Sequence, residues 1–265
     1  MKKIEIDELR ELQMQILDYV DAFCRTHDIK YTISGGTLLG AVRHGGYIPW
    51  DDDIDIQMLR EEYNLFTRLW NNSKEEHPYE FVSIESGNGM GYAYGKVHNP
   101  QTVTYVNDVE RTGVYIDVFP VDNVKDEADF VSRRKRIKWL KRKEAATIVL
   151  ATKKSCWFNR LKCLLISMGK SRTYYAMRIN EIALESDKID CPLVFEMVAG
   201  IKCKRPISKT IFKEYEDIKF ENRKYMAVKD YNNYLIATFG DYMVLPPIEK
   251  RTREHVFISF WREKV

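Results

Sequence analysis

The sequence predicts an α/β (α+β) fold: a mixed β-sheet flanked by helices in residues 1–125, followed by an additional, mainly helical portion in residues 126–265. In the first 122 residues, short β-prone runs alternate with segments of helical periodicity. After Asp126 the pattern is helical and basic to about residue 185. A hydrophobic content of 45% with 12% aromatic residues suffices for a core and argues against disorder.

The first expected element is an amphipathic helix at residues 7–27, where apolar side chains recur every three or four positions from Leu9 to Phe23. A β-prone run at 31–34 then meets the Gly35–Gly36 turn, after which Thr37 is expected to cap a short helix. The other expected elements are that helix at 38–44, strands at 53–56, 81–84, 92–98 and 114–119, a helix at 61–70, and a final part with 217–239 and the Pro246–Pro247 stop.

No targeting or membrane-spanning segment is expected. The N-terminus turns acidic by Glu5 and lacks the apolar stretch of a secretory signal, and the apolar run Cys163–Met168 is far shorter than the roughly 20 residues that span a bilayer. Five cysteines form no Cys-x-x-Cys pair and leave an odd count, so reduced, buried thiols are expected. The protein is therefore expected to be cytoplasmic.

The net charge of +3 conceals a strong asymmetry. Between Ser132 and Asn180 there are 15 basic residues and one acidic residue, whereas the remainder of the chain carries −11. Eight of these cations fall within Arg133–Lys143, and large apolar residues follow from Trp157 to Leu165. This combination suits peripheral contact with an anionic membrane, at its inner face for a cytoplasmic protein. No nucleic acid partner is expected, although nucleic acid could use the same charge, and a solvated helix face is the simpler alternative.

Three aspartates are the candidate catalytic and metal-binding residues. Asp53 and Asp55 lie two apart on an expected strand and so point to one face, and Asp117 is the lone carboxylate of the β-prone run 114–119. Adjacent carboxylates repel unless a cation lies between them, and oxygen ligands suit Mg²⁺ or Mn²⁺. Alternatively, Asp117 forms a local salt bridge or cap, and the Asp51–Asp53 segment is a solvated acidic turn.

The glycine turn precedes this acidic strand by 17 residues. Without side chains, Gly35 and Gly36 let the backbone approach a phosphate, and amides at the start of the following helix point towards anions. Such turns are common, so their weight here comes from their position beside the aspartates.

The run from Ser34 to Ile56 resembles the hallmark of the LicD family of phosphorylcholine transferases, which belong to the nucleotidyltransferase-fold superfamily. That superfamily is marked by a Gly-Gly or Gly-Ser turn followed by an Asp-x-Asp strand. Further matching segments are Lys96–Thr102, Gly113–Asp122, and Phe239–Pro247 with Arg251 and His255 beyond. The resemblance therefore implies a nucleotidyltransferase-type mixed sheet.

The resemblance also implies a function and a metal site. Asp53 and Asp55 would bind the metal, and Asp117 would supply the third carboxylate. Family members are expected to use CDP-choline, or a related CDP-alcohol, and to place phosphocholine or another phospho-alcohol on a sugar hydroxyl, releasing CMP. The acceptor would be a teichoic acid precursor, a lipopolysaccharide or another surface glycan, which can be lipid-linked.

Nucleotide and phosphate contacts are expected from the motif residues. The candidates are Ser34, Gly35, Gly36, Thr37, Arg43, Lys96, Arg251 and His255. His44 is expected at the opening of the same site. A choline group would face aromatic rings, for which Trp50, Tyr92 and Tyr94 lie near the motifs. Each charged candidate could equally be a surface residue, and each aromatic one a core residue.

Two other functions remain open from the sequence. A nucleotidyltransferase proper would attach a nucleoside monophosphate and release pyrophosphate instead of CMP. A non-catalytic nucleotide-binding scaffold would need none of the carboxylates, which are costly to keep together without a function.

Overall fold

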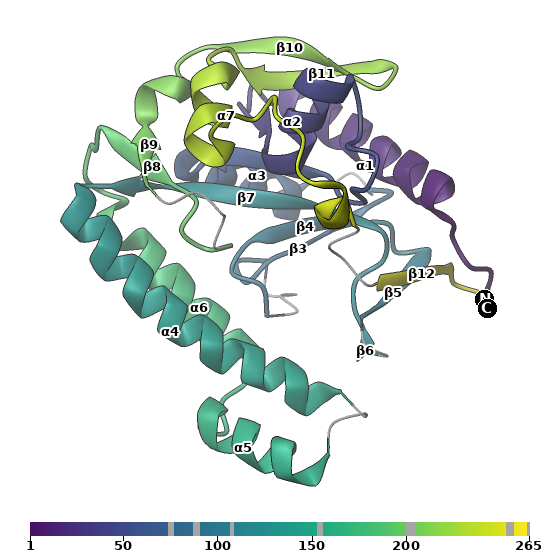
Figure 1. The fold of residues 1–265 in the computed structure, drawn as a ribbon, viewed down its shortest axis with the longest axis vertical. Coiled ribbons are helices and arrows are strands. Elements are labelled where there is room, and N and C mark those ends of the chain that lie inside the picture. Colours follow the sequence, from purple (N-terminus) through teal and green to yellow (C-terminus); the bar gives the residue numbers. More distant parts are fainter. Residues whose placement is uncertain are drawn as a thin grey trace.

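A computed structural model describes residues 1–73, 77–86, 91–106, 109–152, 156–199, 205–252 and 257–263 (Figure 1). Its centre is a seven-stranded mixed sheet with the order β1-β2-β7-β4-β3, which β8 and β9 extend from β7. The strands are β1 (Thr32–Ile33), β2 (Asp55–Leu59), β3 (Glu80–Val82), β4 (Gly95–His98), β7 (Tyr115–Val124), β8 (Leu193–Phe195) and β9 (Ile207–Ser208). The predicted mixed α/β architecture is confirmed.

The register of the sheet sets three charged residues in one row. Strands β2 and β7 pair in parallel with Asp55 opposite Asp117, and β4 pairs antiparallel to β7 with Lys96 opposite the same Asp117. Residues directly opposite one another on paired strands project to the same face. The sheet therefore presents the row Asp55–Asp117–Lys96 across β2, β7 and β4.

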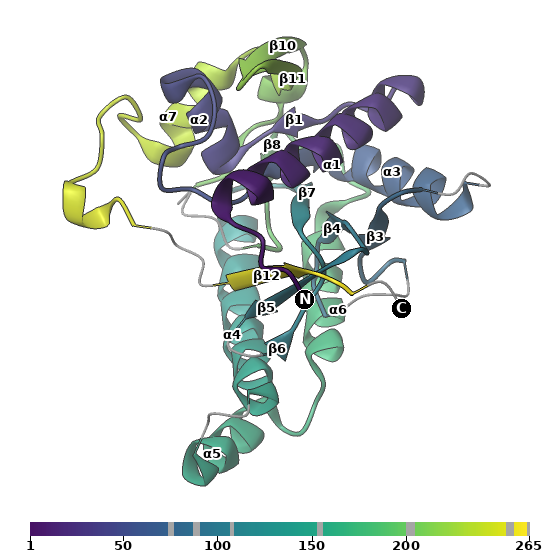
Figure 2. The ribbon, with the colours of Figure 1, turned by 90° about the vertical axis from the view of Figure 1, so that its right-hand side faces the viewer.

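Helices cover both faces of this sheet. In Figure 2, α3 (Arg60–Asn72) lies on one side of β7, and α2 (Gly35–His44) lies with α7 (Tyr231–Phe239) on the other. The predicted N-terminal helix is α1 (Ile6–Thr26), which buries its apolar positions from Leu9 to Phe23. Its periodicity thus predicted the buried face correctly, because one stripe of a helix packs on the core.

The first part of the chain departs from the prediction in detail. Helix α2 begins at Gly35, so Thr37 lies inside the helix and does not cap it. Strand β2 begins at Asp55, so Asp53 precedes the strand instead of lying on it. Not expected from the sequence was a second sheet, formed by β5 (Thr102–Val106), β6 (Val109–Glu110) and β12 (Phe257–Trp261).

The basic part of the chain is helical, as predicted, and extends away from the sheet as an arm (Figure 1). It comprises α4 (Glu127–Ala151), α5 (Trp157–Ser167), α6 (Arg172–Ala183) and the short 3-10 helix η1 (Leu184–Ser186). Asp126 caps α4 by accepting a hydrogen bond from the Asp129 amide, 2.8 Å away. Among the described residues, no helix combines the length and apolarity needed to cross a bilayer.

One cation of the basic run is part of the core. Arg133 is buried and donates to the carbonyl oxygens of Asn123 and Ala183, at 2.7 and 3.0 Å, and to the Asp129 carboxylate at 2.6 Å. It therefore ties α4 to the ends of β7 and α6. The alternative of a wholly solvated helix face therefore does not hold at Arg133.

After the arm, the chain returns to the sheets. Strand β8 pairs with β7, and β12 pairs with β5, so this part contributes to both sheets. The remaining elements are η2 (Lys209–Phe212), the hairpin β10 (Tyr215–Phe220) and β11 (Arg223–Val228), α7, and η3 (Ile248–Lys250). The division at residue 125 stays a prediction.

Candidate active site

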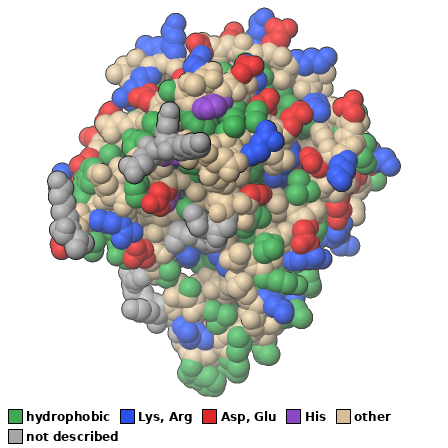
Figure 3. All heavy atoms as spheres, turned by 180° about the vertical axis from the view of Figure 1, so that it is seen from behind, with side chains coloured by type: hydrophobic (Ala, Val, Ile, Leu, Met, Phe, Trp, Pro, Cys, Tyr) green, Lys and Arg blue, Asp and Glu red, His purple; other side chains and the backbone are tan. Residues whose placement is uncertain are grey.

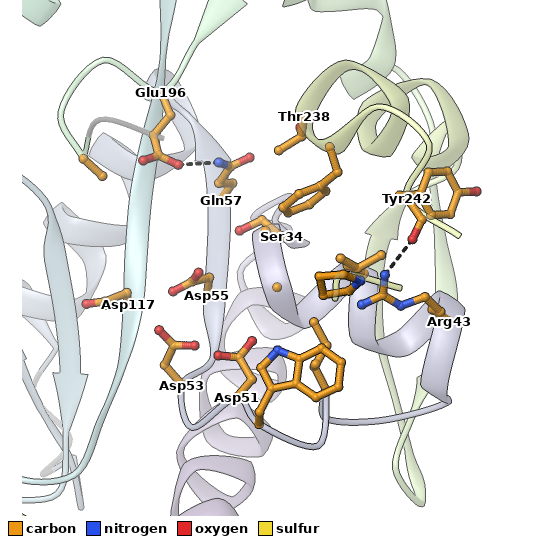
Figure 4. Close-up of a pocket in the computed structure, with 18 of the residues that line it drawn as sticks. Ser34, Arg43, Asp51, Asp53, Asp55, Gln57, Asp117, Glu196, Thr238 and Tyr242 are labelled. Carbon is orange, nitrogen blue, oxygen red and sulfur yellow. Dashed lines mark hydrogen bonds between the residues drawn. The ribbon is translucent and has the colours of Figure 1, made fainter. Parts of the chain in front are cut away.

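A cavity of about 910 Å³ opens where α2, β2, β7 and the segment around α7 meet (Figure 4). Its walls come from the glycine turn, the acidic segment before β2, the residues after β8 and the loop after α7. It is lined by Ser34, Gly35, Gly36, Leu39, Arg43, Ile48, Trp50, Asp51, Asp53, Asp55, Gln57, Tyr94, Asp117, Phe119, Glu196, Ala199, Thr238, Phe239, Asp241, Tyr242, Val244, Leu245, Pro246, Pro247 and Lys250. The three predicted catalytic aspartates thus share one cavity.

The acidic side chains in this cavity repel one another. Asp51, Asp53 and Asp55 border it from the α2 side, and Asp117 lies on the neighbouring strand (Figure 4). Burial raises the pKa of Asp55 well above its usual value, and the charges of Asp53, Asp117, Glu196 and Asp51 raise it further. The ionised cluster is therefore destabilised in the protein alone, and a cation bound there would relieve the repulsion.

Lys96 lies next to Asp117 and is not one of the residues that line the cavity. It is buried, and its ammonium donates to Asp117. Burial by itself lowers the pKa of Lys96, but electrostatic interactions with Asp117, Tyr115, Tyr94 and Tyr92 outweigh it and hold the pKa well above its usual value. The lysine expected to contact phosphate is thus placed as the partner of Asp117.

The glycine turn faces the acidic segment at close range. Gly35 has φ +51°, in the left-handed region that favours glycine, and a Cβ there would lie 3.1 Å from Asp55 Oδ2. A Cβ on Gly36 would lie 2.5 Å from Asp51 Oδ2. The backbone conformation at Gly35 therefore favours glycine, whereas at Gly36 the close atom is the end of the Asp51 side chain, which can move.

The remaining predicted contacts divide into three groups. Ser34 and Arg43 line the cavity, and Arg43 donates to the Tyr242 carbonyl at 2.7 Å. Thr37 instead accepts a hydrogen bond from the Asp55 amide at 2.9 Å, and so positions β2. Arg251 lies beside the cavity with its guanidinium carbon 5.6 Å from the centre of the Trp50 ring.

Two histidines complete the predicted set. His44 is outside the lining and accepts from Arg43 Nε at 3.0 Å, and burial together with the charge of Arg43 lowers its pKa. His255 lies outside the described residues.

A network of polar side chains that was not expected from the sequence borders the same cavity. Gln57 donates to Glu196 at 2.5 Å and accepts from the Tyr234 hydroxyl at 3.0 Å, which in turn accepts from the Gly35 amide at 3.3 Å. Burial raises the pKa of Glu196 well above its usual value. Two signals could have found these residues: Gln57 follows Asp55 at period two, and Glu196 is the lone carboxylate of an apolar run.

Two buried polar atoms of the lining have no hydrogen-bond partner in the described part of the chain: the Ser34 hydroxyl and Glu196 Oε1. Buried polar atoms are nearly always hydrogen-bonded in native proteins. Both atoms therefore keep an unused hydrogen-bonding capacity in the cavity wall.

The donor set fits a hard divalent cation, although the ligands do not close around one. Within the described ranges, no three histidine, cysteine or carboxylate groups converge closely enough to hold a metal ion unaided. Asp117 is engaged by Lys96. Mg²⁺ is commonly bound by one or two carboxylates together with substrate phosphates and water, so Asp53 and Asp55 with a diphosphate would suffice, and Asp117 as the third metal ligand stays a prediction.

Of the three expected aromatic residues, Trp50 and Tyr94 line the cavity. Tyr94 packs against Phe119, which also lines the cavity, with ring centroids 4.6 Å apart. Tyr92 is outside the lining and stacks under Arg172, whose guanidinium carbon lies 4.2 Å from the ring centroid.

Known proteins resemble this chain in sequence. Residues 28–158 match the family described as LicD/FKTN/FKRP, nucleotidyltransferase domain. The chain is 30% identical over 274 residues to the lipopolysaccharide cholinephosphotransferase LicD of Haemophilus influenzae, covering 97% of this chain and 98% of that protein. It is 43% identical over 44 residues to the human ribitol 5-phosphate transferase FKRP, covering 17% of this chain and 9% of that protein. The resemblance of the sequence motifs is thus confirmed, and the chain belongs to the LicD family of transferases.

Proposed function

We propose that this protein transfers phosphocholine, or a similar phospho-alcohol, from a CDP-activated donor to a sugar hydroxyl of a surface glycan, with release of CMP. The observation that carries the proposal is one cavity in which a glycine turn, a group of carboxylates and two unpartnered polar atoms meet. A diphosphate needs backbone amides and a cation, and the sugar hydroxyls need hydrogen-bond acceptors, so the lining offers groups for each part of the substrates.

The phospho-alcohol and the acceptor follow from the relatives as proposals. The Haemophilus relative, which aligns over nearly its whole length, is named for cholinephosphate transfer to lipopolysaccharide. Phosphocholine and a lipopolysaccharide-type glycan are therefore the first pair to test, with teichoic acid precursors second. Trp50, Tyr94 and Phe119 provide rings that can face a quaternary ammonium.

In the proposed mechanism, Asp53 and Asp55 would hold Mg²⁺ or Mn²⁺, and the glycine turn would lie beside the donor diphosphate. The ion, when bound, neutralises negative charge that develops on the leaving CMP. Arg43 can contact the nucleotide at the cavity wall, and Ser34 can donate to a phosphate oxygen. Arg251 and His255 stay candidates for phosphate contacts.

Asp117 and Glu196 are the candidates for the acceptor side. Asp117 or Asp55 would take the proton from the attacking hydroxyl, and Lys96 holds the Asp117 carboxylate in place. Glu196 Oε1 can accept a hydrogen bond from an acceptor hydroxyl, with Gln57 fixing the other oxygen. Glu196→Gln is then expected to raise KM for the glycan more than KM for the donor.

The test is incubation with CDP-choline, CDP-ribitol and other CDP-alcohols in the presence of Mg²⁺, with and without lipopolysaccharide or teichoic acid precursors. CMP release that requires a glycan supports the proposal, whereas pyrophosphate release from a nucleoside triphosphate identifies a nucleotidyltransferase. Nucleotide binding without turnover of any donor identifies a scaffold. Asp53→Asn should abolish CMP release, and Asp190→Asn, at a fully exposed side chain, should leave it unchanged.

We also propose that the protein is cytoplasmic and attaches peripherally to the inner face of the membrane, where a lipid-linked acceptor would be within reach. The basic segment supports this attachment through its charge.

A further inference from the structure

Helix α5 exposes an unusual number of large apolar side chains at the tip of the helical arm (Figure 3). The α5 apolar face consists of Trp157, Phe158, Leu161, Leu164, Leu165 and the following Met168, which are between 48% and 76% exposed. Isolated apolar residues on a surface are ordinary, but a contiguous group of this size indicates an interaction site.

The surface of helix α5 divides into an apolar face, a buried face and cationic borders. At about 100° per residue, the α5 apolar face occupies an arc of about 120°. Cys163 and Ser167, on another side, are buried where α5 packs against α4. Arg160 and Lys162 fall on the two borders of the apolar arc, so cations flank it on both sides.

The positive charge around α5 indicates what kind of partner its apolar face binds. The segment from Ser132 to Asn180 carries +14, so a second copy of this chain would bring like charge against like charge. Nucleic acid would satisfy the cations but leave the apolar side chains against a polar partner. An anionic lipid surface satisfies both, because its headgroups attract the cations and its acyl chains accept the apolar face.

We propose that α5 is an interfacial membrane helix that inserts its apolar face into an anionic bilayer. The lipid binding itself does not depend on the reaction catalysed, whereas its bearing on the acceptor rests on the proposed function. Lys141 of α4 donates to the carbonyl of Ala199, which lines the cavity, at 3.1 Å. Ten residues of α4 separate it from Ala151 at the helix end, a rise of about 15 Å, so the arm sets the height of the cavity above the lipid.

The test is co-sedimentation with vesicles of phosphatidylcholine, with and without phosphatidylglycerol. Wild type should bind the phosphatidylglycerol vesicles. The triple variant Trp157→Ser/Leu161→Ser/Leu165→Ser should lose about a hundredfold in partitioning or more.

A matched triple variant, Val131→Ser/Ile189→Ser/Ile258→Ser, changes exposed apolar residues outside α5 and should bind as wild type does. Arg160→Gln and Lys162→Gln should each weaken binding about fivefold at low salt. CMP release from the CDP-alcohol donor, measured with a soluble acceptor, should be unchanged in the α5 triple variant, which separates lipid attachment from catalysis.

Labelling of the Cys156 thiol, which lies next to α5, measures insertion of the helix directly. Cys156 precedes Trp157 and is exposed, whereas Cys24, Cys163 and Cys191 are buried. In a Cys203→Ser background, maleimide should label Cys156 in solution, and phosphatidylglycerol vesicles should slow the labelling.

Three results would overturn the proposal: no binding to phosphatidylglycerol vesicles, equal binding by the α5 triple variant, or labelling of Cys156 that vesicles leave unchanged. Self-association or RNA binding that the α5 triple variant abolishes, in the absence of lipid binding, would assign the face to that partner instead.

Discussion

Replacing Asp55 with asparagine should make the metal-free protein more stable while it removes activity. Asp55 lies opposite Asp117 in the sheet and shares the cavity with Asp51, Asp53 and Glu196, and burial together with their charges raises its pKa. Asparagine keeps the shape of the side chain and removes one of the mutually repelling charges. Active sites commonly hold such unfavourable charge at the expense of stability.

The size of the effect follows from the register of the strands. Neighbouring strands lie about 4.8 Å apart, and two unit charges about 5 Å apart at an effective dielectric constant near 20 repel by about 3 kcal/mol. The ion pair between Lys96 and Asp117 offsets part of this repulsion. A net gain of about 2 kcal/mol is therefore expected for Asp55→Asn, equivalent to about 4 °C in Tm for a chain of this size.

Thermal unfolding in EDTA at neutral pH measures this difference directly. Asp190→Asn removes a fully exposed carboxylate and serves as the matched control, with no expected shift. Adding Mg²⁺ with CDP should raise the Tm of wild type and leave that of Asp55→Asn nearly unchanged. A variant that melts at or below wild type in EDTA would refute the idea that the carboxylate cluster is electrostatically strained.

Three further outcomes are expected. Gly35→Ala should destabilise the protein by about 1–2 kcal/mol in urea unfolding, because alanine disfavours the left-handed conformation at φ +51°, and unchanged stability would contradict this account of the turn. Arg133→Gln should cost about 3 kcal/mol in the same assay because it leaves buried partners unpaired, whereas Lys135→Gln on the exposed side of α4 should change stability by less than about 0.5 kcal/mol. For Asp129, burial raises the pKa, but the Lys125 amide and the Arg133 guanidinium outweigh it, so the pKa is lowered in the folded protein. Its contribution is therefore present above the unfolded pKa of about 3.9 and is lost as the pH falls below it, so the stability difference between wild type and Asp129→Asn should shrink in acid titrations.

The sequence predicted the parts of the fold whose signals are local. The amphipathic stripe of α1, the glycine turn and the apolar strand around Asp117 each depend on residues close together in the chain, and each was found. Strands β5 and β12 were not, because they are short and lie more than 150 residues apart, and their pairing has no local signature. The start of β2 was misplaced because alternation alone does not say where pairing begins.

The candidate site shows the same division. The motif brought Asp53, Asp55 and Asp117 to one cavity as expected, but it gave no sign that Lys96 would face Asp117. That contact depends on the antiparallel register of β4 and β7, which only the tertiary structure reveals. Glu196 was not predicted because it follows the helical arm in the sequence, about 80 residues after Asp117.

The row Asp55–Asp117–Lys96 has a consequence for how this site can change through evolution. Loss of Lys96 alone leaves Asp117 with an uncompensated buried charge, which typically costs 3–5 kcal/mol, whereas joint replacement of both by apolar residues of similar volume is often close to neutral. Substitutions at the two positions should therefore be strongly epistatic, and a double-mutant cycle should show it as non-additivity. Homologues that lack the aspartate should also lack the lysine. Joint loss of the pair can therefore identify lineages in which this fold has another function.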